Sequence, residues 1–231
     1  TVSAALAAFR ATREAGDWLA LPFFRDGSAE RVAAALDARA AAGAQILPPP
    51  ECVFAALEAT PFHAVRAVIL GQDPYPRPGD AHGFAFSHVG AGRLPPSLLA
   101  IVREVAREFG GEPARRGDLR PWARQGVLLL NAALTVEAGR AGAHLGLGWD
   151  ALADQAIASL SARRDGVVFM LWGAQARAKA GLIDRAKHFV IECGHPSPLN
   201  RARDFPGSAP FSRANAWLEA KGLPPVDWRL A

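Results

Sequence analysis

The stretch that decides the fold is Arg66-Ala67-Val68-Ile69-Leu70-Gly71-Gln72-Asp73-Pro74-Tyr75-Pro76. Its first half is a short apolar run with β-branched residues, which is typical of a strand buried on both faces. Gly71 ends the run, and the prolines exclude regular structure from the residues that follow. Asp73 therefore sits on a stiff loop at the carboxyl end of a buried strand, where open α/β sheets bind ligands. An Asp before Pro also caps turns, so this stretch alone leaves a structural role for Asp73 open.

The same arrangement recurs three times further along the chain. Short apolar runs at residues 126–130, 166–171 and 187–191 are separated by helical patterns, and each run ends in a loop that carries glycine, proline or an isolated polar residue. This alternation predicts an α/β fold with a central four-stranded parallel twisted sheet and helices on both faces. The carboxyl ends of parallel strands share one edge, so we expect the polar residues there to converge on one crevice. These residues are Gln72, Asp73, Tyr75, Asn131, His195 and Ser197.

Helical periodicity predicts the remaining elements. Ser28 is expected to cap the second helix and Ser97 the fourth. The expected helices span residues 2–20, 28–42, 51–59, 98–109, 149–163, 175–185 and 211–221. The 231 residues suit a single domain, 1–231, in which we distinguish a helical N-terminal part, 1–45, from a catalytic core, 46–231.

Composition sets loose limits on location and partners. The net charge of +4 and the pI near 9.7 are compatible with a polyanionic partner but do not require one. No apolar run approaches the roughly 20 residues of a membrane span, and the amino terminus lacks the pattern of a signal peptide. We therefore expect no membrane association and, in a bacterium, a cytoplasmic monomer. Cys52 and Cys193 are expected to be buried free thiols in a reducing compartment.

Several common kinds of site have no support in the sequence. Neither GxGxxG nor GxxxxGK[ST] follows a strand, which argues against a nucleotide site. The six histidines show no HExxH spacing and the cysteines no CxxC, so no metal is predicted. A Ser-His-Asp hydrolase built from Asp73, His195 and Ser197 is conceivable, but the chain has no GxSxG elbow and Ser197 is held between two prolines.

Asp73 and His195, delivered from two different strands, suit hydrolysis without a covalent intermediate. A carboxylate can position water or stabilise developing positive charge, and an imidazole can stabilise negative charge on a leaving group. A lone histidine on a loop is more often structural. Gly194 and Pro196, however, fix the backbone around His195, which favours the functional interpretation.

Three further residues keep two interpretations open at this point. The carboxamide of Asn131, at the end of an apolar strand, needs partners if it is buried, and either a ligand or neighbouring backbone could supply them. Tyr75 and Phe86 would ordinarily be core aromatics. Both lie in loops rich in glycine and proline, where a planar ligand could stack on them.

As a set, these motifs resemble those of family-1 uracil-DNA glycosylases. The resemblance extends over about residues 46–230 and keeps the family's order and spacing. The motifs that carry it are GQDPY at 71–75, AHGFAFS at 81–87, LPPSL at 94–98, WARQGVLLLN at 122–131, LTV at 134–136, LWG at 171–173 and HPSPL at 195–199.

The resemblance implies an enzyme that flips uracil out of single- or double-stranded DNA and hydrolyses its N-glycosidic bond. The product is an abasic site for base excision repair, and the family uses neither a cofactor nor a metal. Two catalytic residues are implied. Asp73 stabilises the oxocarbenium-like sugar and positions water, and His195, as a neutral donor, hydrogen-bonds O2 of the departing uracil.

The resemblance also implies how base and DNA are held. In the uracil pocket, which includes Gln72, Asn131 pairs with the O4 and N3 edge, Tyr75 blocks the thymine methyl group and Phe86 stacks on the ring. Leu199 wedges into the duplex in place of the extruded base. The implied DNA-binding residues are Pro95, Pro96, Ser97, Gly173, Ala174, Ser197, Leu199 and Asn200, with Ser97 and Ser197 on phosphates. A protein inhibitor that mimics DNA is a further candidate partner beside uracil-containing DNA.

The chain departs from the family pattern at four positions. Pro76 stands where many members have histidine, which puts a second imidazole role in doubt. Ala174 and Asn200 each replace a common serine, and Leu47 replaces a tyrosine. Two alternatives remain: a non-catalytic DNA-binding relative, which should lack the acid or the imidazole, and a glycosylase of relaxed base choice, which should have a small residue in place of Tyr75.

Overall fold

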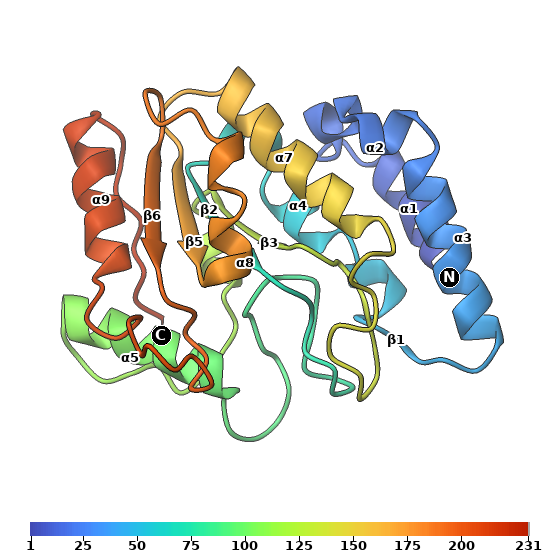
Figure 1. Cartoon of the computed structure of the whole chain (residues 1–231), viewed down its shortest axis with the longest axis horizontal. Coiled ribbons are helices and arrows are strands. Elements are labelled where there is room, and N and C mark those ends of the chain that lie inside the picture. Colours follow the sequence, from blue (N-terminus) through green and yellow to red (C-terminus); the bar gives the residue numbers. More distant parts are fainter. Residues whose placement is uncertain (231) are drawn as a thin grey trace.

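A computed structural model describes residues 1–230 of the chain. Its centre is a parallel sheet of four strands in the order β3-β2-β5-β6 (Figure 1). The strands are β2 (Ala67–Gly71), β3 (Val127–Asn131), β5 (Val168–Trp172) and β6 (Phe189–Cys193). Each lies within two residues of the apolar run that predicted it, and the predicted four-stranded parallel sheet is confirmed.

Burial explains why these strands could be predicted. Every residue of β2, β3 and β5 is buried. Because successive side chains of a strand point to opposite faces, a strand without an exposed residue is covered on both faces. β6 forms an edge of the sheet, and there Glu192 is exposed and Phe189 is half-buried.

Helices flank the sheet, and loops and α5 (Pro96–Phe109) lie beyond the carboxyl ends of the strands (Figure 1). Two longer helices matter for the site: α7 (Trp149–Arg163) connects β3 to β5, and α5 packs against α9. The helices that contact strands directly are α4 (Ala55–Ala59) and α6 (Arg120–Ala123) on β3, α8 (Ala174–Arg177) on β5, and α9 (Pro210–Ala220) on β5 and β6.

The N-terminal residues join the same hydrophobic core. Their helices are α1 (Val2–Ala11), α2 (Pro22–Arg25) and α3 (Ser28–Ala41). Phe9 of α1 stacks on Phe54 with ring centroids 4.8 Å apart, and Phe54 meets Trp149 at the start of α7. A short antiparallel pair, β1 (Ile46–Leu47) with β4 (Val136–Glu137), follows and was not predicted. The division of one domain into parts 1–45 and 46–231 stays a prediction.

Two predicted helices are wrong in extent. The helix expected at 2–20 ends at Ala11, because the hydroxyl of Thr12 bonds Phe9 O and accepts from Ala15 N, and a 3₁₀ turn follows at Gly16–Ala20. The helix expected at 175–185 stops at Arg177 and gives way to a 3₁₀ turn at Ala180–Leu182. This turn contains Gly181, which is unfavourable within a helix, and Lys179 just before it forms a salt bridge with Asp154 on α7 over 2.5 Å.

The predicted caps are wrong as well. Gly27 precedes α3 and Pro95 precedes α5, and neither Ser28 nor Ser97 makes a capping hydrogen bond. Pro96 occupies the first turn of α5, where a missing N–H costs little, so Ser97 is left free for another role. The helix expected at 51–59 is divided into a 3₁₀ turn at Pro50–Cys52 and α4. Cys193 is buried as expected, whereas Cys52 is only partly buried.

Within residues 1–230, no helix combines the length and the apolar character that a membrane crossing requires.

Candidate active site

The register of the sheet brings the predicted polar residues to one edge. Gly71 at the end of β2 pairs with Asn131 at the end of β3, and Trp172 at the end of β5 pairs with Cys193 at the end of β6. The four strands therefore end side by side. A cavity of about 320 Å³ opens there, within the range of small-ligand sites. Among the predicted site residues, those that line it are Gln72, Asp73, Tyr75, Phe86, Ser97, Asn131, His195 and Ser197.

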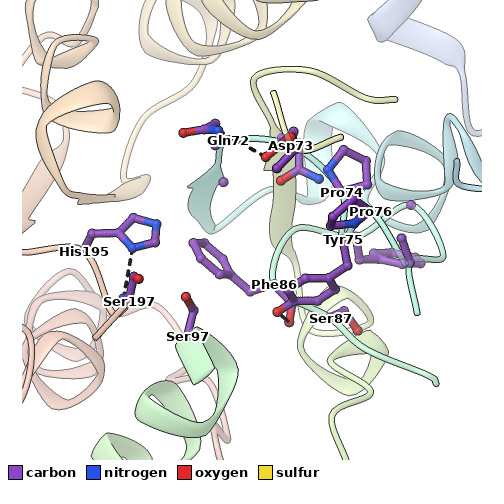
Figure 2. A pocket seen from close by; sticks show the side chains of 16 residues that line it. Gln72, Asp73, Pro74, Tyr75, Pro76, Phe86, Ser87, Ser97, His195 and Ser197 are labelled. Carbon is purple, nitrogen blue, oxygen red and sulfur yellow. Dashed lines mark hydrogen bonds between the residues drawn. The ribbon is translucent and has the colours of Figure 1, made fainter. Parts of the chain in front are cut away.

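Figure 2 shows how the cavity is divided. His195, Ser197 and Ser97 lie on one side, the loop from Asp73 to Pro76 lies on the other, and Phe86 lies between them. These residues come from different elements: the loop from Asp73 to Pro76 follows β2, His195 follows β6, and Ser97 lies in the first turn of α5. The site is therefore built by tertiary structure and not by one local motif.

The remaining predicted residues surround this cavity. Gly173 and Ala174 line a second cavity of about 510 Å³, which shares Gln72 and His195 with the first. Pro96 lines a third, of about 450 Å³, that shares His195 and Ser197. Pro95 precedes α5, Asn200 follows β6, and Leu199 is 88% exposed, the highest value among the large hydrophobic residues that are exposed.

Asp73 is held by two donors at the rim of the cavity. The backbone N–H of Gly142 donates to Oδ2 over 2.6 Å, and Nε2 of Gln72 donates to Oδ1 over 3.3 Å. Burial raises the pKa of Asp73 above its usual value, and the two hydrogen bonds oppose that rise by favouring the ionised form. The carboxylate is thus held in one orientation and poorly hydrated, which suits a group that stabilises positive charge on a ligand.

Gly142 was missed by sequence reasoning, because it lies 69 residues from Asp73. The only signal was the density of glycine between residues 139 and 148, which carries Gly139, Gly142, Gly146 and Gly148. All four have positive φ, and the turns they form bring the backbone of this segment back to the Asp73 loop.

His195 is fixed as a neutral donor. The backbone N–H of Ser197 donates to Nδ1 over 3.0 Å, so Nδ1 carries no proton and the neutral ring is protonated at Nε2. Burial lowers the pKa of His195, which favours the neutral form further. Asn200 Nδ2 donates to the carbonyl of His195 over 3.1 Å and to Asp204 over 2.8 Å, and so braces the loop behind the ring.

Asn131 is buried, with an exposed fraction of 5%, and its carboxamide hydrogen-bonds no group within residues 1–230. Gly71 makes room for it, because a Cβ on Gly71 would collide with Asn131 Oδ1. Of the two kinds of partner considered from sequence, neighbouring backbone is thus not used. The donor and the acceptor of this amide are left for a ligand in the cavity.

The two aromatic residues are rigidly placed. The Tyr75 hydroxyl donates to the carbonyl of Phe86 over 2.8 Å, and burial raises the pKa of Tyr75, so the phenol stays neutral. Phe86 adopts φ +61°, a left-handed backbone conformation that non-glycine residues seldom hold. Strained backbone conformations of this kind cluster at binding sites. Its ring centroid lies 5.8 Å from that of His195 and 5.5 Å from that of Trp172.

His82 and Ser87 support the loop that carries Phe86, and the sequence did not predict this role for them. His82 Nε2 lies 2.7 Å from Ser87 Oγ, and that hydroxyl accepts from Leu119 N over 2.8 Å. Burial lowers the pKa of His82 to about 4, so this histidine is neutral at physiological pH. It holds the loop next to Phe86 and belongs to the support of the site. Within residues 1–230, no group of three or more His, Cys, Asp or Glu residues could hold a metal ion.

In this α/β protein an oriented carboxylate and a neutral imidazole face one cavity, an arrangement that suits a hydrolase acting without a covalent intermediate. The family model described as "Uracil DNA glycosylase superfamily" matches residues 58–219, which span the whole sheet. This chain belongs to that superfamily.

Individual relatives agree with the family match. The uracil-DNA glycosylase of Xanthomonas axonopodis pv. citri is 48% identical over 215 residues, which cover 93% of this chain and 87% of that protein. The uracil-DNA glycosylase of Xylella fastidiosa is 50% identical over 215 residues, which cover 93% of this chain and 83% of that protein. Among solved structures, mimivirus uracil-DNA glycosylase aligns with a TM-score of 0.86 at 25% identity, over 97% of this chain and 89% of that one.

Proposed function

We propose that this chain acts by the family-1 mechanism, with Asp73 and His195 as its catalytic residues. The enzyme is a uracil-DNA glycosylase: it excises uracil from DNA, as membership of the superfamily and relatives near 48% identity indicate. One observation carries the proposed roles. The proton of neutral His195 is placed on Nε2, and an oriented Asp73 carboxylate lines the same cavity.

The chemistry follows from the charges that form as the bond breaks. Cleavage of an N-glycosidic bond leaves positive charge on the sugar and negative charge on the base. The ionised Asp73 stabilises the sugar cation and positions the water that attacks it. His195 donates from Nε2 to O2 of the departing uracil. Removing one such preorganised donor from an enzyme costs about 10²–10³ in rate.

Asn131 supplies the choice of uracil over cytosine. Uracil presents an acceptor at O4 and a donor at N3, which one carboxamide can pair at the same time. Cytosine reverses both groups and is therefore mispaired with the carboxamide in the orientation that uracil requires. A site built on such hydrogen bonds rejects a mispaired analogue by roughly 10⁴–10⁵.

Tyr75 supplies the choice of uracil over thymine. Its hydrogen bond to the carbonyl of Phe86 holds the ring in the cavity, where it occupies the space of a 5-methyl group. Phe86 offers its face to the base. A relaxed base choice would need a small residue at position 75, and this chain has the larger one.

The residues around the cavity hold the extruded nucleotide and its flanks. Leu199 projects into solvent and enters the duplex in place of the base. Ser97 and Ser197 line the cavity on the same side as His195 and bind the adjacent phosphates, together with Pro95, Pro96, Gly173, Ala174 and Asn200. Ala174 contributes backbone only.

Three further parts of the proposal concern the state of the protein and its partners. Mimivirus UNG Y322L has been solved in complex with UGI. We expect a DNA-mimicking protein inhibitor to cover the same cavity in this chain. A monomeric state, location in the cytoplasm and action on single- as well as double-stranded DNA stay predictions.

The test is single-turnover base release from matched oligonucleotides that carry uracil, thymine or cytosine. We expect release of uracil alone, with a loss of at least about 10²-fold in both Asp73→Asn and His195→Ala. Asp118→Asn is a matched control, because Asp118 is also a partly buried aspartate but bonds Arg120 instead of facing the cavity.

Each other outcome would change one part of the proposal. Release of thymine would remove Tyr75 from its assigned role. Release of uracil that persists in Asp73→Asn would remove the carboxylate from catalysis. Binding of DNA without release of any base would leave the non-catalytic relative as the correct interpretation.

A further inference from the structure

A groove lined with arginines leads away from the catalytic cavity along α5. The cavity of about 450 Å³ that shares His195 and Ser197 with the active site is also lined by Arg103 and Arg203. It continues into a groove of about 590 Å³ through Pro96, Leu99 and Arg103, which line both. Arg93 and Arg115 line the far part. The groove is therefore continuous with the site of the flipped nucleotide.

The four arginines of this groove carry uncompensated charge. Arg93, Arg103, Arg115 and Arg203 are exposed, and within residues 1–230 none of them forms a salt bridge or a side-chain hydrogen bond. No acidic residue lines either part of the groove. Elsewhere the chain commonly pairs its arginines, as in Arg107 with Glu104 and Arg120 with Asp118. A row of unpaired guanidinium groups favours a polyanion.

The nearby carboxylates are engaged in building the wall of the groove. Buried Glu104 on α5 accepts from the backbone N–H groups of Gly207 and Ala209, each over 3.0 Å. Glu108 accepts from Ser212 N over 2.5 Å. These bonds fasten the segment after Leu199 to α5, which lies beside it in Figure 1, and the carboxylates of Glu104 and Glu108 are used in these contacts.

The second cavity beside the active site has no unpaired cation among the residues that line it. The cavity of about 510 Å³ that adjoins Gln72 and His195 is lined by Asp150 and Lys179, and Lys179 is paired with Asp154 over 2.5 Å. Ala174 offers no side-chain donor there. A DNA strand that leaves the cavity in this direction meets no free cation among the residues that line it, whereas a strand that leaves over Ser97 meets four.

From this asymmetry we propose that the groove along α5 binds the DNA strand that flanks the flipped nucleotide, with Arg93, Arg103 and Arg115 on its phosphates. The proposal rests on the proposed function and extends it beyond the immediate site. Pro96 and Arg103 lie on one face of α5, seven residues apart, so Arg103 is about 10 Å along the helix from the cavity rim. In B-form DNA, where each strand advances 3.4 Å per nucleotide along the axis, that distance corresponds to about three nucleotides. Leu94 and Leu99 give the bases an apolar surface between the cations.

The test compares long and short uracil-containing single strands with the variant Arg93→Ala/Arg103→Ala/Arg115→Ala. A matched control, Arg13→Ala/Arg25→Ala/Arg124→Ala, removes the same charge from exposed arginines that line neither part of the groove. Fluorescence anisotropy on a 15-nucleotide strand, about five times the reach of the groove, measures Kd from about 50 to 200 mM salt. Single-turnover uracil release from a trinucleotide, which ends before Arg103, measures the chemistry separately.

For the groove variant we expect at least about a tenfold loss of affinity for the long strand at 50 mM salt, and a salt slope shallower by about 2, since each phosphate contact on a single strand contributes about 0.7. Release from the trinucleotide should stay unchanged, and the control should bind as the parent does. If the unaltered protein releases no uracil from the trinucleotide, that result would contradict the proposed function and not the groove.

Three outcomes would overturn the groove itself. Affinity for the long strand that is unchanged in the groove variant would make the arginines a site for another polyanion, such as an acidic peptide. An equal loss in the control would assign the effect to net charge alone. A third variant, Arg93→Lys/Arg103→Lys/Arg115→Lys, keeps the charge, and equal affinity of the parent protein for a neutral strand analogue and for DNA would show that the groove does not bind phosphates.

Discussion

The backbone N–H of Ser197 donates to Nδ1 of His195 over 3.0 Å. Pro196 and Pro198 on either side of Ser197 have no N–H of their own, so this contact depends on the one residue between them that can donate. It places the proton of the neutral imidazole on Nε2, the nitrogen available to the base. The proline-rich loop after β6 therefore fixes the tautomer of His195 as well as the path of the chain.

Nitrogen NMR of the imidazole checks this arrangement. We expect the ¹⁵N shifts of His195 to show the Nε2–H tautomer at pH 7, with protonation only below pH 6.5, because burial lowers the pKa of His195. Ser197→Ala keeps the backbone donor and should leave the tautomer unchanged while it weakens DNA binding. An Nδ1–H tautomer, or a titration midpoint at or above 6.5, would contradict the assignment.

The buried Asp73 carboxylate should lower the stability of the fold. Burial raises its pKa in the folded protein above the value in the unfolded chain, so the ionised form is disfavoured by folding. The resulting loss of stability is complete above the folded pKa and absent below the unfolded one, near 3.8. Asp73→Asn should therefore raise the melting temperature at pH 7, and the gain should shrink as the pH falls toward 4.

Asp118 provides a control of opposite sign. The hydrogen bonds and charge of Arg120 lower the pKa of Asp118 despite its partial burial, so its ionised form is favoured by folding. Asp118→Asn should lower the melting temperature at pH 7, and that loss should fade as the pH falls. Equal shifts of the same sign in both variants would show that the charge of neither residue is responsible.

Much of the site was predictable because local sequence marks the end of each strand. Apolar runs located β2, β3, β5 and β6, and the polar residue after each run located Asp73, Asn131 and His195. Parallel register does the rest, since it aligns the strand ends without further information. For the same reason the fold class followed from sequence.

What could not be predicted depends on contacts between distant segments. The Gly142 donor reaches Asp73 only through turns built from four glycines with positive φ, and the Glu104 bonds to Gly207 and Ala209 join segments about a hundred residues apart. The false cap at Ser97 has a different cause. Pro96 already begins α5, so Ser97 lies within the first turn and not at the N-cap position before the helix, and it lines the cavity instead.

Leu199 should matter for duplex DNA and not for the fold. Its side chain is 88% exposed, so Leu199→Ala should leave the melting temperature unchanged. Extruding a base from a duplex costs a few kcal/mol of unstacking, which a side chain that fills the gap offsets. We expect single-turnover release of uracil from duplex DNA to fall by about tenfold, since about 1.4 kcal/mol corresponds to a factor of ten.

Single-stranded DNA provides the contrast, because it has no partner base to replace. Release from a single strand should change by less than about twofold in Leu199→Ala. Leu182→Ala, which removes another exposed leucine that lines none of the cavities around the site, should leave both rates unchanged. Equal losses on the two substrates would mean that Leu199 supports the chemistry in some other way.

Gly173 should be indispensable for the position of His195. A Cβ on Gly173 would lie 2.9 Å from Cβ of His195, closer than carbon atoms approach, and Gly173 holds φ +86°. Gly173 also has ψ 171°, a combination that is essentially restricted to glycine, so Gly173→Ala adds both backbone strain of about 1–3 kcal/mol and a displacement of the imidazole. Gly207→Ala is the comparison, because Gly207 also holds φ +86° but has nothing within 4 Å of its Cβ position. Both variants should lose stability in urea unfolding. Only Gly173→Ala should lose uracil release, by roughly 10² for a misplacement of about 1 Å, and equal activity in the two variants would show that His195 tolerates the shift.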